Sequence, residues 1–312
     1  MKLSIVICTR DRAATLEQTL AELLPQIAEE GSDVELVVVA NDVSDNTLEV
    51  CRSAGVTCVE EPKRGLSHAR NTSVAVTRGD AILWLDDDVS PEPGFLNAYL
   101  DALEHYPADA FFGGAIHPDL QGNPPRWAKS ALKVIPNVWA GLDLTQADQS
   151  LQNVDYPHPY GANMLVRRSA LVVPFRSDIG RNGGKLLVGG EETAFFRLLK
   201  QRGLTGRWVE KATVRHRIGP DRQTLDYVRR YFIGQGIQSV ALGDVVMKEG
   251  LVRRVKGALR VARYWLRYVR KRLSSEPEVW LRAYAEFNMQ MGRQAASSFL
   301  RSSSAAIPGE TR

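Results

Sequence analysis

The sequence predicts an α/β fold, a mostly parallel sheet flanked by helices, with a C-terminal amphipathic helical extension. Apolar runs typical of strands alternate with helix-like segments along the first hundred residues. These runs are mostly apolar, as expected for parallel strands covered on both faces. A basic segment with helical spacing follows near the C-terminus. The 312 residues, 44% of them hydrophobic, are enough for a sizeable core.

The first third reads as consecutive strand–helix units. The first strand precedes a segment with Leu16, Leu20, Leu23 and Ile27 at 3.6-residue spacing, which predicts a helix. Later in this region, Ser90 is expected to cap a helix and Pro91 to occupy its first position. The expected strands cover 3–8, 34–40, 56–60 and 81–85, and the later helices cover 47–54, 67–77 and about 91–106.

The rhythm breaks after this region. Residues 107–160 are rich in proline and glycine, which predicts loops folding over a site. Regular structure is expected again at 163–168. A helix is then expected from Glu192 to the natural C-cap Gly203, and a strand at 208–216.

The segment 251–271 predicts a helix with one apolar face and one basic face. Between Lys248 and Arg272 lie ten basic residues and one acidic residue, although the whole chain carries a charge of only +4. This charge indicates an anionic partner. Three interpretations are open: an interfacial membrane anchor, a nucleic-acid patch, or a packed helix with a solvated basic face. From Arg301 onward the chain is expected to be disordered.

The compartment expected from the sequence is the cytoplasm. No apolar run is long enough to span a bilayer, and the N-terminus lacks the pattern of a secretory signal. The three cysteines are too few and too irregular for a disulfide framework. We expect them to be reduced and structural.

Polar clusters follow the first two strands, at the edge where open α/β sheets bind ligands. The first contains Thr9, Arg10, Asp11 and Arg12; the second contains Asn41, Asp42, Ser44 and Asp45. Helix capping would account for Asp11 and Asp45. It would not account for Arg10 and Arg12, because a helix start disfavours cations. An anionic ligand such as a diphosphate would.

The third cluster is Asp86-Asp87-Asp88, after the strand at 81–85. Carboxylates at this spacing suit Mg²⁺ or Mn²⁺, with phosphate oxygens completing the coordination shell. The structural alternative is a polar strand end followed by a cap, for which one carboxylate would suffice. The chain has no P-loop and no dinucleotide fingerprint after the first strand, so a metal and basic side chains must bind any phosphate.

Six motifs together resemble family 2 glycosyltransferases with the GT-A fold, over the first two-thirds of the chain to about Gly236. They are SIVICTRDR, VVVANDVSDNT, RGLSHARNTSVAVTRGDAILWLDDDVSPEPGFL, YGANMLVRR, GGEETAFFRLLKQRG and VRHRIG, in the family's order. Two departures are Cys8, where the family often has proline, and the shifted register of Asp42.

The resemblance implies a nucleotide-diphosphosugar donor and a Mn²⁺ or Mg²⁺ cofactor. By position in the motifs, Thr9, Arg10 and Asp42 would hold the base and ribose, and Arg70 would reach the donor. Of the aspartates, Asp86 and Asp88 would bind the metal with His216, Asp86 would also face the donor, and Asp87 would reach the ribose. Glu192 would be the catalytic base, with Glu191 in reserve. Arg12, which follows the first strand, is also expected to bind the donor through its positive charge.

The function that follows is inverting, metal-dependent transfer of a sugar from a nucleotide diphosphosugar, of which a UDP-sugar is the first choice. The expected acceptor is a glycan or a polyprenyl- or lipid-linked molecule in cell-surface polysaccharide or glycolipid synthesis. We expect an anionic membrane surface, bound through 248–272 at the inner face of the membrane, and no nucleic acid. The expected domains are a catalytic domain at 1–236 (donor half 1–106, acceptor half 107–236), a basic helical extension at 237–300 and a tail at 301–312.

Two alternatives remain. A sugar-1-phosphate nucleotidyltransferase would share the sheet, but the loop CTRDRAATL lacks the glycines usual in those enzymes. A non-enzymatic, membrane-associated binding module would leave the acidic clusters without a role.

Overall fold

A computed structural model describes residues 2–144, 149–151, 158–184, 186–245 and 251–304. The chain forms two compact units. The first comprises 1–119, 139–177 and 191–218, and the second comprises 120–138, 178–190 and 219–312. Residues 219–236, which the sequence grouped with the catalytic part, thus cluster with the C-terminal helices. The boundaries of folding domains stay a prediction.

The first unit is built on a sheet whose parallel part was correctly predicted. In the order β3-β2-β1-β4, all neighbours are parallel. Ile5, Val38 and Leu83 are fully buried, as the continuous apolar runs require. The strands are β1 (Leu3–Thr9), β2 (Val34–Asn41), β3 (Thr57–Glu61) and β4 (Ala81–Asp86).

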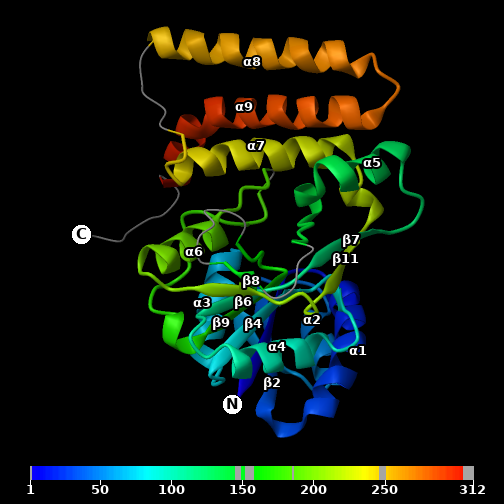
Figure 1. The fold of residues 1–312 in the computed structure, drawn as a ribbon, viewed down its shortest axis with the longest axis vertical. Helices are drawn as coiled ribbons and strands as arrows, with labels where there is room; N and C mark the ends of the chain where they lie inside the picture. Colours follow the sequence, from blue (N-terminus) through cyan, green and yellow to red (C-terminus); the bar gives the residue numbers. More distant parts are fainter. Residues whose placement is uncertain (1, 145–148, 152–157, 185, 246–250, 305–312) are drawn as a thin grey trace. The chain divides into compact units, whose positions relative to one another are not determined.

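Helices cover both faces of this sheet (Figure 1). Leu16 and Leu20 of α1 and Phe95 of α4 pack on one face with Ile5, whereas Ala69 of α3 and Phe196 of α6 belong to the core on the other. The helices are α1 (Ala13–Glu30), α2 (Thr47–Ser53), α3 (Leu66–Val76), α4 (Phe95–His105) and α6 (Glu191–Gln201), with short 3₁₀ turns at Gly31–Asp33, Pro136–Trp139, Arg168–Ala170 and Pro220–Arg222.

The sheet continues through a strand in the segment 163–168, where regular structure was expected. The single strand expected at 208–216 is instead two strands, Gly206–Trp208 and Val214–Ile218. β9 (Asn163–Arg167) lies antiparallel between β4 and β6 (Phe111–Gly113), and β10 (Gly206–Trp208) runs parallel to β6. β8 (Gln149–Ser150) closes the edge. The fold class predicted from the sequence, a mostly parallel α/β sheet flanked by helices, is confirmed.

A second, small sheet corrects the expected helix start at Ser90 and Pro91. These residues lie in β5 (Val89–Pro91), which pairs antiparallel with β11 (Val214–Ile218), and α4 begins only at Phe95 after Gly94. Pairing with a distant strand thus outweighs the local capping signal. β7 (Ile116–Leu120) completes this sheet in the order β5-β11-β7.

Residues 107–160 contain more regular structure than the expected loops. Besides β6, β7 and β8, they contain the helix α5 (Arg126–Val134). The strands here are two to five residues long, too short to show a periodic pattern.

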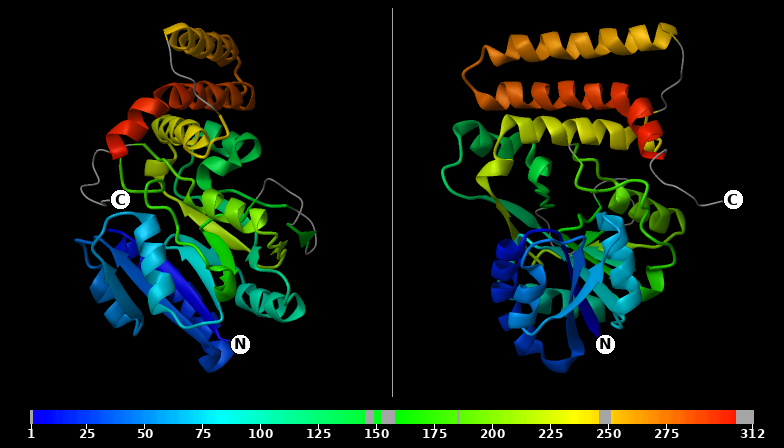
Figure 2. Two further views of the ribbon diagram at one scale, coloured as in Figure 1. Left: turned by 90° about the vertical axis from the view of Figure 1, so that its left-hand side faces the viewer. Right: turned by 180° about the vertical axis from the view of Figure 1, so that it is seen from behind.

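The second unit contains α7 (Leu225–Ala241), α8 (Leu251–Arg272) and α9 (Pro277–Ser304). α9 packs between α7 and α8 (Figures 1 and 2). A Cβ on Gly236 would lie 2.1 Å from the carbonyl oxygen of Met289, so the absence of a side chain at Gly236 allows α7 and α9 to approach closely. Arg301–Ser304 are helical and not disordered, while 305–312 lie outside the described residues. Within the described chain, the helices are too short or too polar to cross a membrane.

Candidate active site

The ends of β1 and β2 form two loops that brace each other. Asp11 and Asp42 both adopt a left-handed backbone conformation, with φ of 50°. The carboxylate of Asp11 accepts a hydrogen bond from the Ser44 amide at 2.7 Å, and that of Asp45 accepts one from the Ala13 amide at 2.8 Å. Asp45 therefore caps the start of α1 from the neighbouring loop, which supports the capping interpretation for this residue.

Arg10 and Asp42 form an accessible pair beside these loops. Arg10 Nη2 lies 3.5 Å from Asp42 Oδ2, with side chains that are 30% and 44% exposed. Arg10 Nε also donates to the Asp42 carbonyl at 3.4 Å. An exposed pair of this kind is weakly held, so both groups can turn to a ligand.

The predicted metal ligands Asp86, Asp88 and His216 come together. Their nearest ligand atoms all lie within 4.8 Å of one another. Because β11 pairs with β5, His216 lies opposite Val89, one residue after Asp88. Two carboxylates and one imidazole are a donor set suited to Mn²⁺, and also to Mg²⁺ with added water or phosphate oxygens.

The surroundings of His216 orient it as a ligand. Its Nδ1 lies 2.7 Å from the carbonyl oxygen of Trp139, and its Nε2 lies 3.1 Å from Asp88 Oδ1. A proton on Nδ1 would donate to that carbonyl and leave Nε2 to bind a cation, the usual arrangement around metal-binding histidines. Burial and the neighbouring Asp88 raise the pKa of Asp86. A bound cation would offset this repulsion, so the residues fit the metal.

Thr9, Arg12 and Asp87 form the next cluster. Asp87 accepts hydrogen bonds from Thr9 Oγ1 and from Arg12 Nη1, both at 2.6 Å. Arg12 Nη2 also reaches Asp88 Oδ2 at 2.7 Å, so one guanidinium bridges two of the three aspartates. Burial raises the pKa of Asp87 to about 7, although Arg12 acts in the opposite direction. In this structure these donor-binding candidates thus satisfy one another.

The predicted base residues, Glu192 and Glu191, both contact the guanidinium of Arg70. Arg70 Nη1 contacts Glu191 Oε1 at 2.9 Å, and Arg70 Nη2 contacts Glu192 Oε1 at 3.3 Å. The side chains of Arg70 and Glu191 are 2% and 1% exposed, whereas that of Glu192 is 19% exposed. The guanidinium of Arg70 is thus buried against the two glutamates, and its expected contact with the donor stays a prediction.

The two glutamates have opposite pKa shifts. Burial and the Glu192 carboxylate raise the pKa of Glu191 to about 8. Burial would also raise the pKa of Glu192, but Arg70 and the hydrogen bonds to its carboxylate, one of them from Glu191, together outweigh burial, and the pKa falls to about 2. One buried arginine neutralises one carboxylate, so the more exposed Glu192 is ionised while Glu191 keeps its proton.

The group formed by Arg70, Glu191 and Glu192 interacts electrostatically with the predicted metal ligands. Arg70 and Glu192 both act on the pKa of Asp86, in opposite directions. The edge of the sheet thus combines a divalent-cation site, an ionised carboxylate and an accessible arginine. Such a site can hold a phosphorylated ligand and accept a proton from a nearby hydroxyl.

Comparison with known proteins places this geometry in a family. The sequence profile of glycosyl transferase family 2 matches residues 4–173, more than half of the chain. The chain belongs to glycosyl transferase family 2. It is a glycosyltransferase, and the resemblance expected from its motifs is confirmed.

Two relatives and two solved structures resemble this family 2 glycosyltransferase. The glucosyl-dolichyl phosphate glucuronosyltransferase of Haloferax volcanii is 24% identical over 73% of each chain. The succinoglycan biosynthesis protein ExoM of Rhizobium meliloti is 25% identical over 75% of this chain and 74% of its own.

A mannosyltransferase from Pyrobaculum calidifontis, solved with GDP-mannose and Mn²⁺, has a TM-score of 0.55 at 17% identity, covering 97% of this chain and 86% of its own. A mycobacterial protein has a TM-score of 0.52 at 18% identity, covering 79% and 76%. At these identities the structural likeness shows the fold, which matches the expected GT-A class.

The candidate site of this glycosyltransferase includes residues that the sequence did not single out. A Cβ on Gly161 would lie 1.9 Å from Arg70 Nη2 and 2.7 Å from Glu192 Oε1, so glycine is needed there. The Trp139 carbonyl orients His216, and no sequence signal can predict a backbone contact of this kind. Cys8 lies beside Asp86 in the sheet register, and burial raises the pKa of its thiol to about 12.

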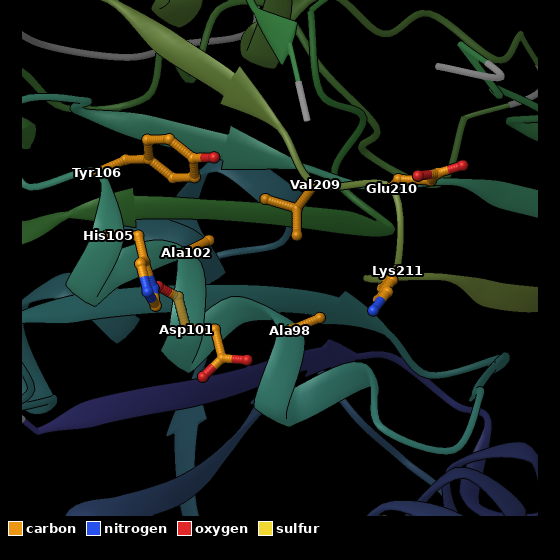
Figure 3. A pocket seen from close by; sticks show the side chains of 8 residues that line it. All are labelled: Ala98, Asp101, Ala102, His105, Tyr106, Val209, Glu210 and Lys211. Atoms are coloured by element: carbon orange, nitrogen blue, oxygen red, sulfur yellow. The ribbon is translucent and has the colours of Figure 1, made fainter. Parts of the chain in front are cut away.

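A surface pocket of about 330 Å³ lies elsewhere in the glycosyltransferase's first unit (Figure 3). Its lining comes from α4 and from residues 209–211, and includes Asp101, His105 and Glu210. None of its eight lining residues belongs to the clusters at the sheet edge. Its open, mixed lining offers no arrangement for sugar transfer.

Proposed function

We propose that this chain is an inverting, metal-dependent glycosyltransferase that moves a sugar from a nucleotide diphosphosugar to an acceptor hydroxyl. One observation carries the proposal: Glu192, an ionised and partly exposed carboxylate, shares an electrostatic site with the cation-binding set Asp86, Asp88 and His216. A base beside a diphosphate-binding metal is what displacement at the anomeric carbon requires.

Donor binding is assigned to the sheet edge. Asp86, Asp88 and His216 would hold Mn²⁺ or Mg²⁺, which when bound neutralises the departing diphosphate. Arg10 and Asp42 are exposed enough to contact the nucleoside. Thr9, Arg12 and Asp87, which are hydrogen-bonded to one another, are assigned to the same donor site. A UDP-sugar is the first donor to test. A GDP-sugar is the second, because the similar Pyrobaculum structure contains GDP-mannose.

The reaction would use Glu192 as the base. The acceptor oxygen attacks the anomeric carbon, the bond from that carbon to the diphosphate oxygen breaks, and the hydroxyl proton passes to the Glu192 carboxylate. Glu192 is preferred to Glu191 because its side chain is 19% exposed against 1%. Attack from the face opposite the diphosphate inverts the anomeric configuration.

The acceptor is assigned to the glycan or lipid-linked class in cell-surface polysaccharide or glycolipid synthesis. The names of the two relatives support this choice, one being a glucosyl-dolichyl phosphate glucuronosyltransferase and the other a succinoglycan biosynthesis protein. The basic segment 248–272, of which 251–272 are described, would place the enzyme on the anionic inner face of the cell membrane. Family membership favours glycosyl transfer over the nucleotidyltransferase and binding-module alternatives.

The proposal is tested by screening nucleotide sugars for metal-dependent stabilisation, followed by transfer assays with the donor found. Glu192→Gln should retain donor binding and lose transfer by at least about a hundredfold, because general base catalysis contributes on that order. Glu191→Gln is the matched control and should retain most of the transfer rate. Wild-type transfer by Glu192→Gln would overturn the base assignment, and turnover of a nucleoside triphosphate with pyrophosphate release would overturn the reaction class.

A further inference from the structure

Helix α8 packs on α9 by a narrow edge. Tyr268 lies with its ring centroid 5.1 Å from that of Tyr284, and Arg267 Nη1 lies 2.8 Å from Glu286 Oε2. A Cβ on Gly257 would lie 2.0 Å from Gln294 Oε1, so the helices approach closely there as well. These contacts run antiparallel along the two helices. They use one side of α8 around Gly257, Val261, Tyr264 and Tyr268.

The apolar face of α8 is a different side and is exposed. Leu259 is 64% exposed, Leu266 is 60% exposed and Leu273, directly after the helix, is 87% exposed. At 100° per residue, these residues lie more than 90° from the middle of the side that packs on α9. The exposed apolar stripe comprises Val255, Leu259, Trp265, Leu266, Val269 and Leu273, and no other part of the described chain has so many exposed large apolar residues.

A basic arc lies along the stripe. Lys256, Arg260, Arg263, Arg267 and Arg270 follow one another around the helix between the stripe and the side that packs on α9, and all are exposed. Arg267, near the α9 side, also pairs with Glu286. From 255 to 272 the sequence contains no acidic residue. The helix therefore has three sides: one packed on α9, one apolar and open, and one cationic.

Apolar and cationic sides next to each other suit a surface that is itself apolar below and anionic above. A bilayer containing anionic lipid has this order, with acyl chains beneath charged headgroups. A second copy of α8 seated on the stripe would instead bring two basic arcs together without an acidic residue on either helix to offset them. A nucleic acid would match the arc and leave the apolar stripe in water.

We infer that α8 lies in the plane of an anionic bilayer, with the stripe from Val255 to Leu273 among the acyl chains and the arc on the headgroups. This deepens the proposed function and rests on it only for the choice of a membrane-associated acceptor. It identifies the apolar stripe, beyond charge alone, as the part that enters the lipid. Trp265 at the margin of the stripe is a natural reporter of that entry.

The test uses the full chain with vesicles of phosphatidylcholine, with and without phosphatidylglycerol. We expect co-sedimentation with the anionic vesicles and a blue shift of tryptophan emission that Trp265→Phe abolishes. Leu259→Ser with Leu266→Ser should weaken vesicle binding about tenfold or more, since two large apolar groups are lost. Val172→Ser is the matched control, because Val172 is also exposed, at 55%, but lies in the first unit.

Three outcomes would overturn the inference. The first is equal vesicle binding by the double variant, which would show that charge alone acts. The second is a concentration-dependent dimer that the double variant abolishes, with no vesicle binding by the wild type. The third is binding to a single-stranded oligonucleotide in preference to anionic vesicles. Donor stabilisation and donor hydrolysis need no lipid, so these assays separate a failure here from a failure of the proposed function.

Discussion

Arg70 Nη1 lies 2.9 Å from Glu191 Oε1, with both side chains at most 2% exposed, and Glu192 shares the same guanidinium. A buried arginine between two adjacent carboxyl groups can neutralise only one of them. The pair thus fixes the ionisation of the more exposed glutamate and holds it in place. Arg70 is a positioning residue for the proposed base.

Loss of the guanidinium should destabilise the fold in a pH-dependent way. Arg70→Met leaves an uncompensated carboxylate, and breaking a buried pair of this kind costs about 3–5 kcal/mol of unfolding free energy. The loss should be large at pH 8 and smaller at pH 5, where the carboxyl groups can take up protons. Denaturant unfolding at both pH values measures it. Arg10→Met, which breaks an exposed pair, should cost less than about 1 kcal/mol; equal effects of the two substitutions would contradict a structural role for Arg70.

Gly161→Ala should displace the proposed base Glu192 although Glu192 itself is unchanged. The added methyl group would lie 1.9 Å from Arg70 Nη2, so the guanidinium and Glu192 must move. A displacement of about 1 Å at a reacting group lowers rates about a hundredfold. The transfer rate with saturating donor measures the effect. Gly189→Ala is the control, because its Cβ would make an ordinary 3.5 Å contact with Gln238; a larger loss there would point to general damage to the loop before α6.

Glu191 should make the native state less stable as the pH rises. Its pKa is raised from 4.5 to about 8 in the folded chain, so the folded state retains a proton that the unfolded state releases above about pH 4.5. The stabilising effect is full below that pH and is lost as the pH rises through about 8. Glu191→Gln, which mimics the protonated acid, should gain stability relative to the wild type between pH 5 and 8. Within this window Glu192 stays ionised in both states, and parallel stability curves for the two proteins would refute the assignment.

Metal and nucleotide should stabilise the enzyme together. At a ligand concentration a hundredfold above Kd, the unfolding free energy rises by about 2.7 kcal/mol. His216→Ala removes one of three ligands, so Mn²⁺-dependent stabilisation by the nucleotide should fall sharply, and a chelator should abolish it in the wild type. Thermal unfolding measures both. His117→Ala is the matched control, since His117 forms an exposed pair with Asp143, and its response to metal should equal that of the wild type.

Much of the parallel half of the fold follows from the sequence. Runs such as Leu3–Thr9 and Ala81–Asp86 are largely apolar because both sheet faces are covered, and this pattern is local. The Ser90-Pro91 signal predicted a helix start, but pairing of β5 with β11 depends on residues more than a hundred positions away. Local propensity carries no information about such a partner.

The candidate site was predictable only in the parts that local sequence motifs specify. Asp86, Asp88 and His216 were grouped through the motifs of the family, and the structure brings them together. The burial of Arg70 was not predictable, because it depends on α6 and on the missing side chain at Gly161. Likewise, the helical pattern of α8 was plain in the sequence, but the side by which it packs on α9 was not.

The directions of the C-terminal helices bear on how α8 can be studied. Tyr284 Oη contacts the Leu225 carbonyl near the starts of α9 and α7, and Arg293 Nε contacts Ser239 Oγ farther along both, so the two helices run parallel. A chain leaving the end of α7 must therefore travel back along the bundle before α9 can begin, and the 22 residues of α8 cover about 33 Å of that return. Simple excision of α8 would pull α7 and α9 out of register. Its contribution is best measured by point substitution, or by replacing it with a polar segment of equal reach.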